Sequence, residues 1–449
     1  MVRLRHGSGI LMWEVPLMDK KERFQKIVEL IGKKTEADDY ILEYENENEA
    51  LTRFADNKVT QNIDSQREKV SLTVWYDGKK ATVTSADCSE DGLVELIRKS
   101  EKAAQASVQD KEYLPSLEED GQVVELMVDP EVLKAGPQER AAIAGRAIGM
   151  AEKNHVTIYG TVFHTLKATG LATANGLIKY YENTSAGYSN TIDKKGEKGN
   201  SFSNGYDLAS MEPERDFEKA LQDAELLQKR KEFEPGRYNV LISAQAASKL
   251  MVWLGFFGAD RRAVDEGYSP YSGKIGQKLV DSRISIGTDP AHHAAPSLPF
   301  DSHGLAIPRR MLIDKGILKD IPCSRFWAEK NGYEPWSVSN VILSDGTKSE
   351  EELLATMGRG FYIKDLWYIR MVRMEDFTLT GMTRNGFFYV EDGKIITGAT
   401  HFRWNDSPLR MLKDIIDIGK GSGFVDSWYS IFTPPLLVKD FYLSSKTLF

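Results

Sequence analysis

The residue types best suited to metal or acid–base chemistry are the seven histidines, three of which lie close together in the sequence. His292, His293 and His303 fall within one short stretch that also contains Asp301. Imidazole and carboxylate groups both bind zinc, so these four residues are candidate metal ligands. However, neighbouring side chains point in different directions, and the surrounding Ala and Pro residues are typical of an exposed loop. The spacing therefore favours no metal site here, and no H-E-x-x-H motif occurs in the chain.

Two cysteines and a few glycines are the other residues with a chemistry of their own. Cys323 would act as a nucleophile only if a neighbouring base lowered the pKa of its thiol. A buried, inert thiol is the commoner state of an isolated cysteine, and the same holds for Cys88. Gly255 and Gly258 match neither the dinucleotide-binding nor the phosphate-binding glycine pattern. The residues alone therefore indicate no catalytic residue and no cofactor in this chain.

Composition excludes several classes of protein. The chain has 449 residues, with 58 Lys and Arg against 66 Asp and Glu, which gives a net charge of −8. An acidic chain is disfavoured as a direct nucleic-acid binder, because a phosphate backbone attracts positive charge. No apolar run approaches the ~18 residues that indicate a membrane span. Two cysteines fit a reducing compartment, so we expect a cytoplasmic protein without membrane contact.

Hydrophobic periodicity predicts an α+β protein, in which an N-terminal α/β layered domain precedes a predominantly antiparallel β domain. Residues 1–18 are expected to be a flexible N-terminal arm or an upstream start. The N-terminal domain is predicted over 19–233, in two sub-units at 19–113 and 123–233. The sequence Phe-Glu-Pro-Gly at 233–236 breaks a helical pattern, so the C-terminal domain is predicted over 234–449.

Two segments carry more specific expectations. Residues 194–205 are rich in Gly, Ser and Lys and are predicted to form a mobile loop. Residues 244–257 are predicted to form an apolar helix, which lies either in the core or at an interface.

From residue 19 onward the sequence resembles the TldD/PmbA family, known as modulators of DNA gyrase and as microcin-processing peptidases. Residues 53–61 (RFADNKVTQ) resemble the family pattern R-x-A-x-N-x-x-x-Q. Residues 271–276 (YSGKIG) resemble an S-G-x-x-G element, and 299–304 (PFDSHG) are similar to an F-D-D/S-E-G block, with His303 at a position that is commonly acidic. Residues 312–319 and the closing segment 434–441 (PPLLVKDF) follow in the family's order. The motifs are individually short, but their order spans most of the chain.

The resemblance implies a system of two types of subunit. The TldD type resembles a zinc metallopeptidase with an H-E-x-x-x-H helix and a further cysteine ligand near its C-terminus. The TldE (PmbA) type lacks these ligands and pairs with the first, and the complex trims unfolded or modified peptides. The resemblance places the family's metal helix between a strand at 238–242 and Ser272. In this sequence no His, Asp, Glu or Cys occurs from Tyr238 to Ala259, and no cysteine follows Cys323. Zinc needs three protein ligands even in an open catalytic site, so the chain resembles the TldE type.

The resemblance also implies partners and contact residues. We expect a TldD-like, zinc-containing H-E-x-x-x-H subunit as a partner, or a second copy of this chain, and an unfolded peptide held by strand addition. The chain alone is expected to be inactive. The residues matched to the family's motifs are the candidate peptide or partner contacts, namely Ser272, Gly273, Gly276, Asp301 and Gly304.

Two alternatives remain open from the sequence. One is a self-sufficient hydrolase with a substitute metal site at His292, His293, Asp301 and His303. The other is a protein-binding modulator of DNA gyrase that acts without proteolysis.

Overall fold

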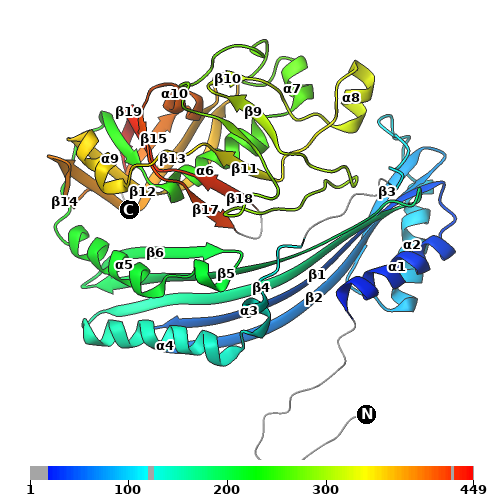
Figure 1. The fold of residues 1–449 in the computed structure, drawn as a ribbon, viewed down its shortest axis with the longest axis horizontal. Helices are drawn as coiled ribbons and strands as arrows, with labels where there is room; N and C mark the ends of the chain where they lie inside the picture. Colours follow the sequence, from blue (N-terminus) through cyan, green and yellow to red (C-terminus); the bar gives the residue numbers. More distant parts are fainter. Residues whose placement is uncertain (1–18, 120–125, 426–428, 448–449) are drawn as a thin grey trace, which may run out of the picture.

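A long, curved antiparallel sheet and a β-rich domain above its concave face make up the molecule (Figure 1). The structure is a computed structural model that describes residues 19–119, 126–425 and 429–447. The predicted arm at 1–18 lies outside these residues. The mixture of helices and mostly antiparallel strands confirms the α+β class.

The N-terminal sheet has six strands in the order β3-β2-β1-β4-β5-β6. Their bounds are β1 Asp39–Ala55, β2 Lys58–Tyr76, β3 Lys79–Ser85, β4 Thr157–Thr173, β5 Ile178–Lys194 and β6 Glu197–Gly205. β1 pairs with β4 from Ile41↔Thr173 to Phe54↔Gly160. The two predicted sub-units therefore contribute the two halves of one continuous sheet.

Helices cover the convex face of this sheet. Successive side chains of a strand point to opposite faces, and on the convex side Leu42 and Tyr44 pack against α1 and α2. Farther along the same face, Phe54 and Ile158 pack against α4 and α5. The helices of this domain are α1 Lys20–Lys34, α2 Glu90–Gln105, α3 Pro130–Lys134, α4 Pro137–Lys153 and α5 Pro213–Leu227, with a 3₁₀ turn at Leu208–Ser210. The concave face is thereby left to meet the C-terminal domain (Figure 1).

The prediction of a mobile loop at 194–205 is wrong. Lys195 and Gly196 form a tight turn with positive φ angles, and the chain returns as β6, paired along β5. The abundance of small residues has a packing reason. A Cβ at Gly199 would lie 1.9 Å from the carbonyl oxygen of Ala220, so only glycine lets β6 pass beneath α5.

The C-terminal domain is built around a closed ring of strands. β12 pairs with both β7 and β13, so the order β12-β7-β19-β15-β13 returns to its starting strand. The strands of this sheet are β7 Gly236–Ile242, β12 Gly360–Arg373, β13 Thr378–Glu391, β14 Lys394–Gly398, β15 Phe402–Asp406, β16 Ile415–Ile418 and β19 Leu436–Lys446. Within this sheet β7 and β12 run parallel, and the other described pairs run antiparallel.

A second sheet in the order β10-β9-β8-β11-β18-β17 lies beside the ring. Its strands are β8 Ile286–Thr288, β9 Arg310–Asp314, β10 Ile317–Leu318, β11 Asn340–Leu343, β17 Ser422–Val425 and β18 Ser430–Thr433. The helices of the domain are α6 Ala244–Val252, which continues as a π-helical turn at Trp253–Phe257, then α7 Arg261–Asp265, α8 Arg325–Asn331, α9 Glu350–Met357 and α10 Pro408–Lys413. Both sheets and α6 share one hydrophobic core.

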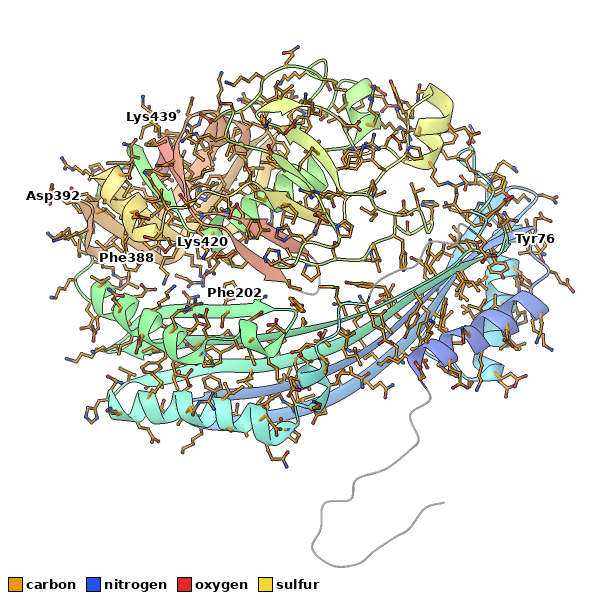
Figure 2. All side chains as sticks on the ribbon, in the orientation of Figure 1. Tyr76, Phe202, Phe388, Asp392, Lys420 and Lys439 are labelled. Carbon is orange, nitrogen blue, oxygen red and sulfur yellow. The ribbon has the colours of Figure 1, made fainter. Side chains whose placement is uncertain are left out.

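The two domains touch at both ends of the long sheet. At one end Phe202 of β6, labelled in Figure 2, packs against Phe424 of β17 with ring centroids 5.9 Å apart. At the other end Arg262 pairs with Glu112 at 2.7 Å. Between these ends, Phe300 of the C-terminal domain packs on Leu171, Leu177 and Tyr181 of the sheet. Among the described residues, no helix combines the length and apolar character needed to span a bilayer.

Candidate functional site

A groove between the concave face of the sheet and the C-terminal domain is the main candidate site. Two adjoining cavities of about 540 and 350 Å³ form it, and they share Thr169, Leu298 and Ser339. The floor comes from β1, β4 and β5, and the roof comes from residues 296–307 and 337–339. We refer to these two cavities together as the sheet groove.

Four glutamates of β1 face this groove. Glu43, Glu45, Glu47 and Glu49 are spaced two residues apart, so they share one face of the strand, opposite the buried Leu42 and Tyr44. All four line one or both cavities. The β1 strand therefore presents a row of carboxylates along the floor.

Cations of the neighbouring strands neutralise part of this row. Lys69 and Lys167 lie 3.0 and 3.3 Å from the carboxylate of Glu45, and Arg67 pairs with Glu49. Burial acts to raise the pKa of Glu45, but the charges of Lys167 and Lys69 outweigh it and hold that pKa below its ordinary value. Glu47 stands directly opposite Arg67 in β2 and Lys167 in β4.

Glu43 is different from the other three glutamates. Its cross-strand neighbours are Ser71 and Leu171, and no ion pair within 4.0 Å involves it in the described part of the chain. Burial, and then the negative charge of Glu45, raise the pKa of Glu43, and the positive charge of Lys69, which lies beyond ion-pairing distance, only partly opposes them. Among the described residues, the groove thus contains one half-buried carboxylate that no cation approaches within 4.0 Å.

Polar side chains make up much of the remaining floor. Thr165 and Ser185 are joined by a hydrogen bond of 2.7 Å across β4 and β5, and Asn183 lies beside them. Such short hydroxyl and amide groups hydrogen-bond to a peptide backbone without reading its side chains.

Of the five predicted contact residues, Asp301 lines the groove, and Gly304 lies in the same loop without lining either cavity. Asp301 lines the smaller cavity, where its carboxylate accepts hydrogen bonds from the backbone N–H groups of His303 and Leu305 and from the hydroxyl of Ser337. Gly304 has a φ of 84°, and a Cβ there would lie 2.3 Å from a methyl carbon of Leu177, so glycine lets this loop rest on the sheet. Asp301 therefore shapes the roof of the groove.

The other three predicted contact residues belong to a turn of the C-terminal domain. Gly273 and Gly276 have positive φ angles, and the N–H of Gly276 donates to the carbonyl of Leu318 in β10. The hydroxyl of Ser272 is buried without a hydrogen-bond partner in the described structure. These residues do not line the sheet groove, and their part in peptide or partner contact stays a prediction.

The candidate histidines are not arranged as a metal site. The rings of His292 and His293 stack with centroids 4.9 Å apart, and His292 also packs on Phe432. His303 is part of the turn closed by Asp301. Throughout residues 19–119, 126–425 and 429–447, no group of three or more His, Cys, Asp or Glu side chains gathers in a way that could hold a metal ion.

The segment that would carry the zinc motif also does not fit the metal. In α6 and the π-helical turn after it, Leu250, Met251 and Leu254 are at most 1% exposed and form part of the main core. The partly exposed side of this segment carries Trp253 and Phe256, and Phe256 packs on Tyr429. Apolar side chains supply no zinc ligand.

Both cysteines are buried thiols. Burial raises the pKa of Cys323 to about 11 and that of Cys88 to about 12. Neither thiol is therefore activated as a thiolate nucleophile near neutral pH.

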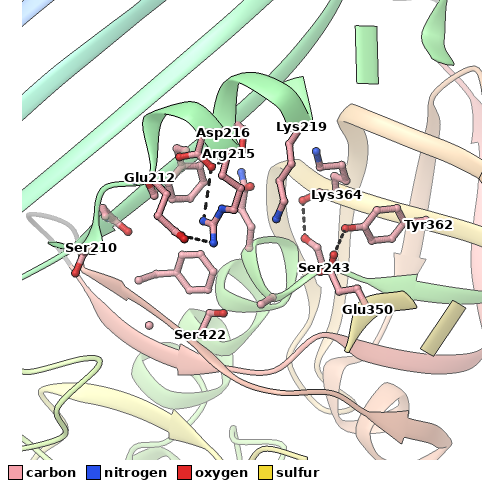
Figure 3. A pocket seen from close by; sticks show the side chains of 18 residues that line it. Ser210, Glu212, Arg215, Asp216, Lys219, Ser243, Glu350, Tyr362, Lys364 and Ser422 are labelled. Carbon is pink, nitrogen blue, oxygen red and sulfur yellow. Dashed lines mark hydrogen bonds and ion pairs between the residues drawn. The ribbon is translucent and has the colours of Figure 1, made fainter. Parts of the chain in front are cut away.

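A second cavity, of about 260 Å³, lies where α5 and β6 meet α6, α9 and β17. Arg215 and Lys219 point from α5 into it (Figure 3). Arg215 pairs with Glu212, and the hydroxyl of Tyr362 donates to Glu350 at 2.8 Å. Because Arg215 and Glu350 already have partners within the cavity and the cavity lies between the two domains, we regard it as part of the domain junction and a weaker candidate than the sheet groove.

Sequence reasoning missed the glutamates of the groove floor, although a signal was present. The alternation of Glu with Tyr and Asn over 43–49 shows that one face of β1 is acidic. It does not show that the acidic face is roofed by another domain, because that contact joins segments far apart in the sequence.

Comparison with known proteins agrees with this geometry. A family model described as PmbA/TldA metallopeptidase domain 1 matches residues 42–104, and one described as the PmbA/TldA metallopeptidase C-terminal domain matches residues 235–445. A protein named metalloprotease from Methanothermobacter thermautotrophicus is 23% identical over 206 residues, which is 42% of this chain and 45% of that protein. The match thus spans less than half of that relative.

Solved structures share the fold over nearly the whole chain. TldE from Thermococcus kodakarensis superposes with a TM-score of 0.84 at 15% identity, covering 94% of this chain and 100% of that one. A candidate modulator of a DNA gyrase from Thermotoga maritima superposes with a TM-score of 0.79 at 21% identity, covering 95% of this chain and 100% of that one. Another candidate modulator of DNA gyrase, from Bacteroides thetaiotaomicron, superposes with a TM-score of 0.81 at 16% identity, covering 95% of this chain and 99% of that one. At such low identities the superpositions show only that the fold is shared. The two family models together match more than half of the chain. The chain therefore belongs to the PmbA/TldD family.

Proposed function

We propose that this chain is a TldE/PmbA-like, non-catalytic subunit of a TldD-type zinc metallopeptidase complex that trims unfolded or modified peptides. The observation that carries the proposal is the apolar character of α6 and its π-helical turn, where the family's catalytic type has its metal helix. Residues 238–259 contain no His, Asp, Glu or Cys, and three protein ligands are the minimum for catalytic zinc. In this proposal the zinc belongs to a TldD-like partner.

The role of this chain would be to hold the peptide. The floor of the sheet groove is the face of β1, β4 and β5, which are paired on both edges, so a peptide there would not extend the sheet by strand addition. The short polar side chains of this floor suit an extended peptide whose backbone they hydrogen-bond, which demands little of its sequence.

The first test is a tagged pull-down from the native host with mass-spectrometric identification of the captured chains. We expect a similar-sized chain with an H-E-x-x-x-H motif to be recovered. Reconstitution then compares this chain alone, the partner alone and both together for zinc content and for cleavage of an unfolded peptide. Stoichiometric zinc and peptide cleavage by this chain alone would contradict the proposal.

A second candidate is a modulator of DNA gyrase, because two of the structural relatives are described by that name. The net charge of −8 favours action through protein contacts, not through DNA. A supercoiling assay with and without the chain tests it, and equal supercoiling in both would dispose of this candidate.

A further inference from the structure

We propose that the sheet groove selects a peptide with a basic side chain, lysine or arginine, and that Glu43 receives the charged end of that side chain. This inference rests on the proposed peptide-holding role and adds a substrate class to it.

The charge distribution in the smaller cavity is the first step. Its lining includes three carboxylates, those of Glu43, Glu45 and Asp301, and no Lys, Arg or His side chain. Two of the three already have partners: Glu45 pairs with two lysines, and Asp301 accepts three hydrogen bonds from its own loop and from Ser337. Glu43 alone is left to accept a charged donor.

The shape of the cavity is the second step. Around the carboxylates its walls are apolar, and the wall residues are Leu171, Leu298, Phe300, Ile307 and Val338. Lysine and arginine carry a hydrocarbon stem with a charge at the tip, so they bury the stem against apolar walls and direct the tip to a polar group. A volume of about 350 Å³ leaves room for one such side chain.

A buried hydroxyl is an independent sign that the groove is completed by a ligand. Tyr181 is 3% exposed and lines the adjoining cavity, directly opposite Thr169, which both cavities share. Its hydroxyl has no hydrogen-bond partner in the described structure. Buried polar groups in proteins are nearly always paired, and the backbone of a peptide lying in the groove would supply the missing partner.

The electrostatics of Glu43 agree with this assignment. Burial and the charge of Glu45, partly opposed by the charge of Lys69, raise the pKa of Glu43, so a negative charge on this carboxyl costs more free energy than it would in water. A bound ammonium or guanidinium group removes that penalty, whereas an acidic peptide side chain would add to it.

The test compares peptides that differ in one charge. A fluorescent, unfolded Gly/Ser/Ala peptide containing a single lysine is titrated against the full chain, beside the same peptide with norleucine in place of lysine. We expect the lysine peptide to bind about tenfold more tightly, as one charge-assisted hydrogen bond would give. In the E43Q variant the ratio should fall close to one, while the affinity of the norleucine peptide stays unchanged.

A matched control makes the same chemical change outside the groove. E29Q removes a carboxylate on the exposed side of α1, on the convex face, and should keep the tenfold ratio. If circular dichroism shows that E43Q does not fold, the affinity ratio of the two peptides is measured instead with the wild-type chain at increasing salt. A preference that depends on charge weakens toward ~1 M salt. A salt-independent preference would overturn the inference.

The remaining outcomes separate this inference from the proposed function. Equal binding of both peptides, or a preference that survives in E43Q, overturns the assignment of Glu43 and leaves the peptide-holding role intact. If no peptide binds to the chain, the peptide-holding role fails and this inference fails with it.

Discussion

At the scale of single residues, burial and partner geometry decide which charged groups are structural. Arg140 of α4 is 2% exposed, and its guanidinium donates to Asp64 at 2.7 Å and to Asn62 at 3.0 Å, both on β2. It also lies 2.9 Å from Nε2 of His164. Because arginine can only donate, this contact requires a neutral His164 whose Nε2 accepts. Burial, and then the charge of Arg140, lower the pKa of His164 accordingly.

Removing this arginine should weaken the attachment of α4 to the sheet. We expect Arg140→Met to lower the free energy of unfolding by about 2 kcal/mol, since hydrogen bonds to charged groups contribute about 1.5–3 kcal/mol. The control is Arg146→Met on the same helix, whose pair with Glu214 is solvent-exposed and should change stability by less than about 1 kcal/mol. Urea unfolding of both variants measures the difference, and equal losses would contradict a structural role for Arg140.

The stability of the chain should also depend on His401. Burial, and then the charges of Arg230 and Arg384, lower the pKa of His401 to about 4. The unfolded chain, with an ordinary His pKa near 6.5, takes up a proton as the pH falls below that value, whereas the folded chain does not. Stability present at pH 7 is therefore lost as the pH falls from about 6.5 to about 4.

The H401Q variant isolates this contribution. Gln does not titrate, so the variant should lose less stability than the wild type between pH 7 and pH 5, measured by urea unfolding at both pH values. Parallel losses in the two proteins would show that other groups dominate this range.

At the scale of elements, close backbone contact explains several glycines that local patterns misread. Gly199 lies where β6 passes beneath α5, with Ala220 O only 1.9 Å from the position of a Cβ. Gly149 in α4 has nothing within 4 Å of that position. Gly199 is therefore needed for the close contact of β6 with α5, whereas Gly149 has no such contact in α4.

Alanine substitutions should have opposite effects at these two sites. Gly199→Ala forces β6 away from α5 and should destabilise the chain by about 1–3 kcal/mol, the usual range for overpacking. Gly149→Ala should stabilise it by about 0.5–1 kcal/mol, because alanine costs less backbone entropy in a helix. Thermal unfolding of the two variants checks the signs, and a neutral Gly199→Ala would show that β6 is free to shift.

At the scale of the whole molecule, contacts at opposite ends of the sheet help to join it to the C-terminal domain. The Phe202–Phe424 contact is apolar, and the Arg262–Glu112 pair is about half exposed on both sides. Exposed ion pairs contribute little, whereas aromatic burial contributes more. The Phe202–Phe424 contact should therefore contribute more to the attachment of the two domains than the Arg262–Glu112 pair, beside the packing of Phe300 on the sheet.

Hydrogen exchange can compare the two ends. Phe202→Ala should lower the protection of the amides of β17 about tenfold or more, the change expected for a loss of at least 1.4 kcal/mol in the opening free energy. Arg262→Gln should leave β17 protection within about threefold of the wild type. Equal effects of the two substitutions would contradict the larger contribution of the Phe202–Phe424 contact.

The sequence by itself determined the features that depend on neighbours along the chain. The apolar character of residues 244–257 predicted a helix, which the structure has as α6 and the π-helical turn after it, and residues 238–259 contain no zinc ligand of the family's catalytic type. The tertiary structure decided everything that depends on contacts between distant segments. It turned the predicted loop at 194–205 into β6, and it placed Glu43, which no described cation approaches within 4.0 Å, beneath a roof contributed by residues about 250–300 positions away. Local periodicity reports which face of an element is apolar, but whether a polar face meets water or another domain is set by long-range packing.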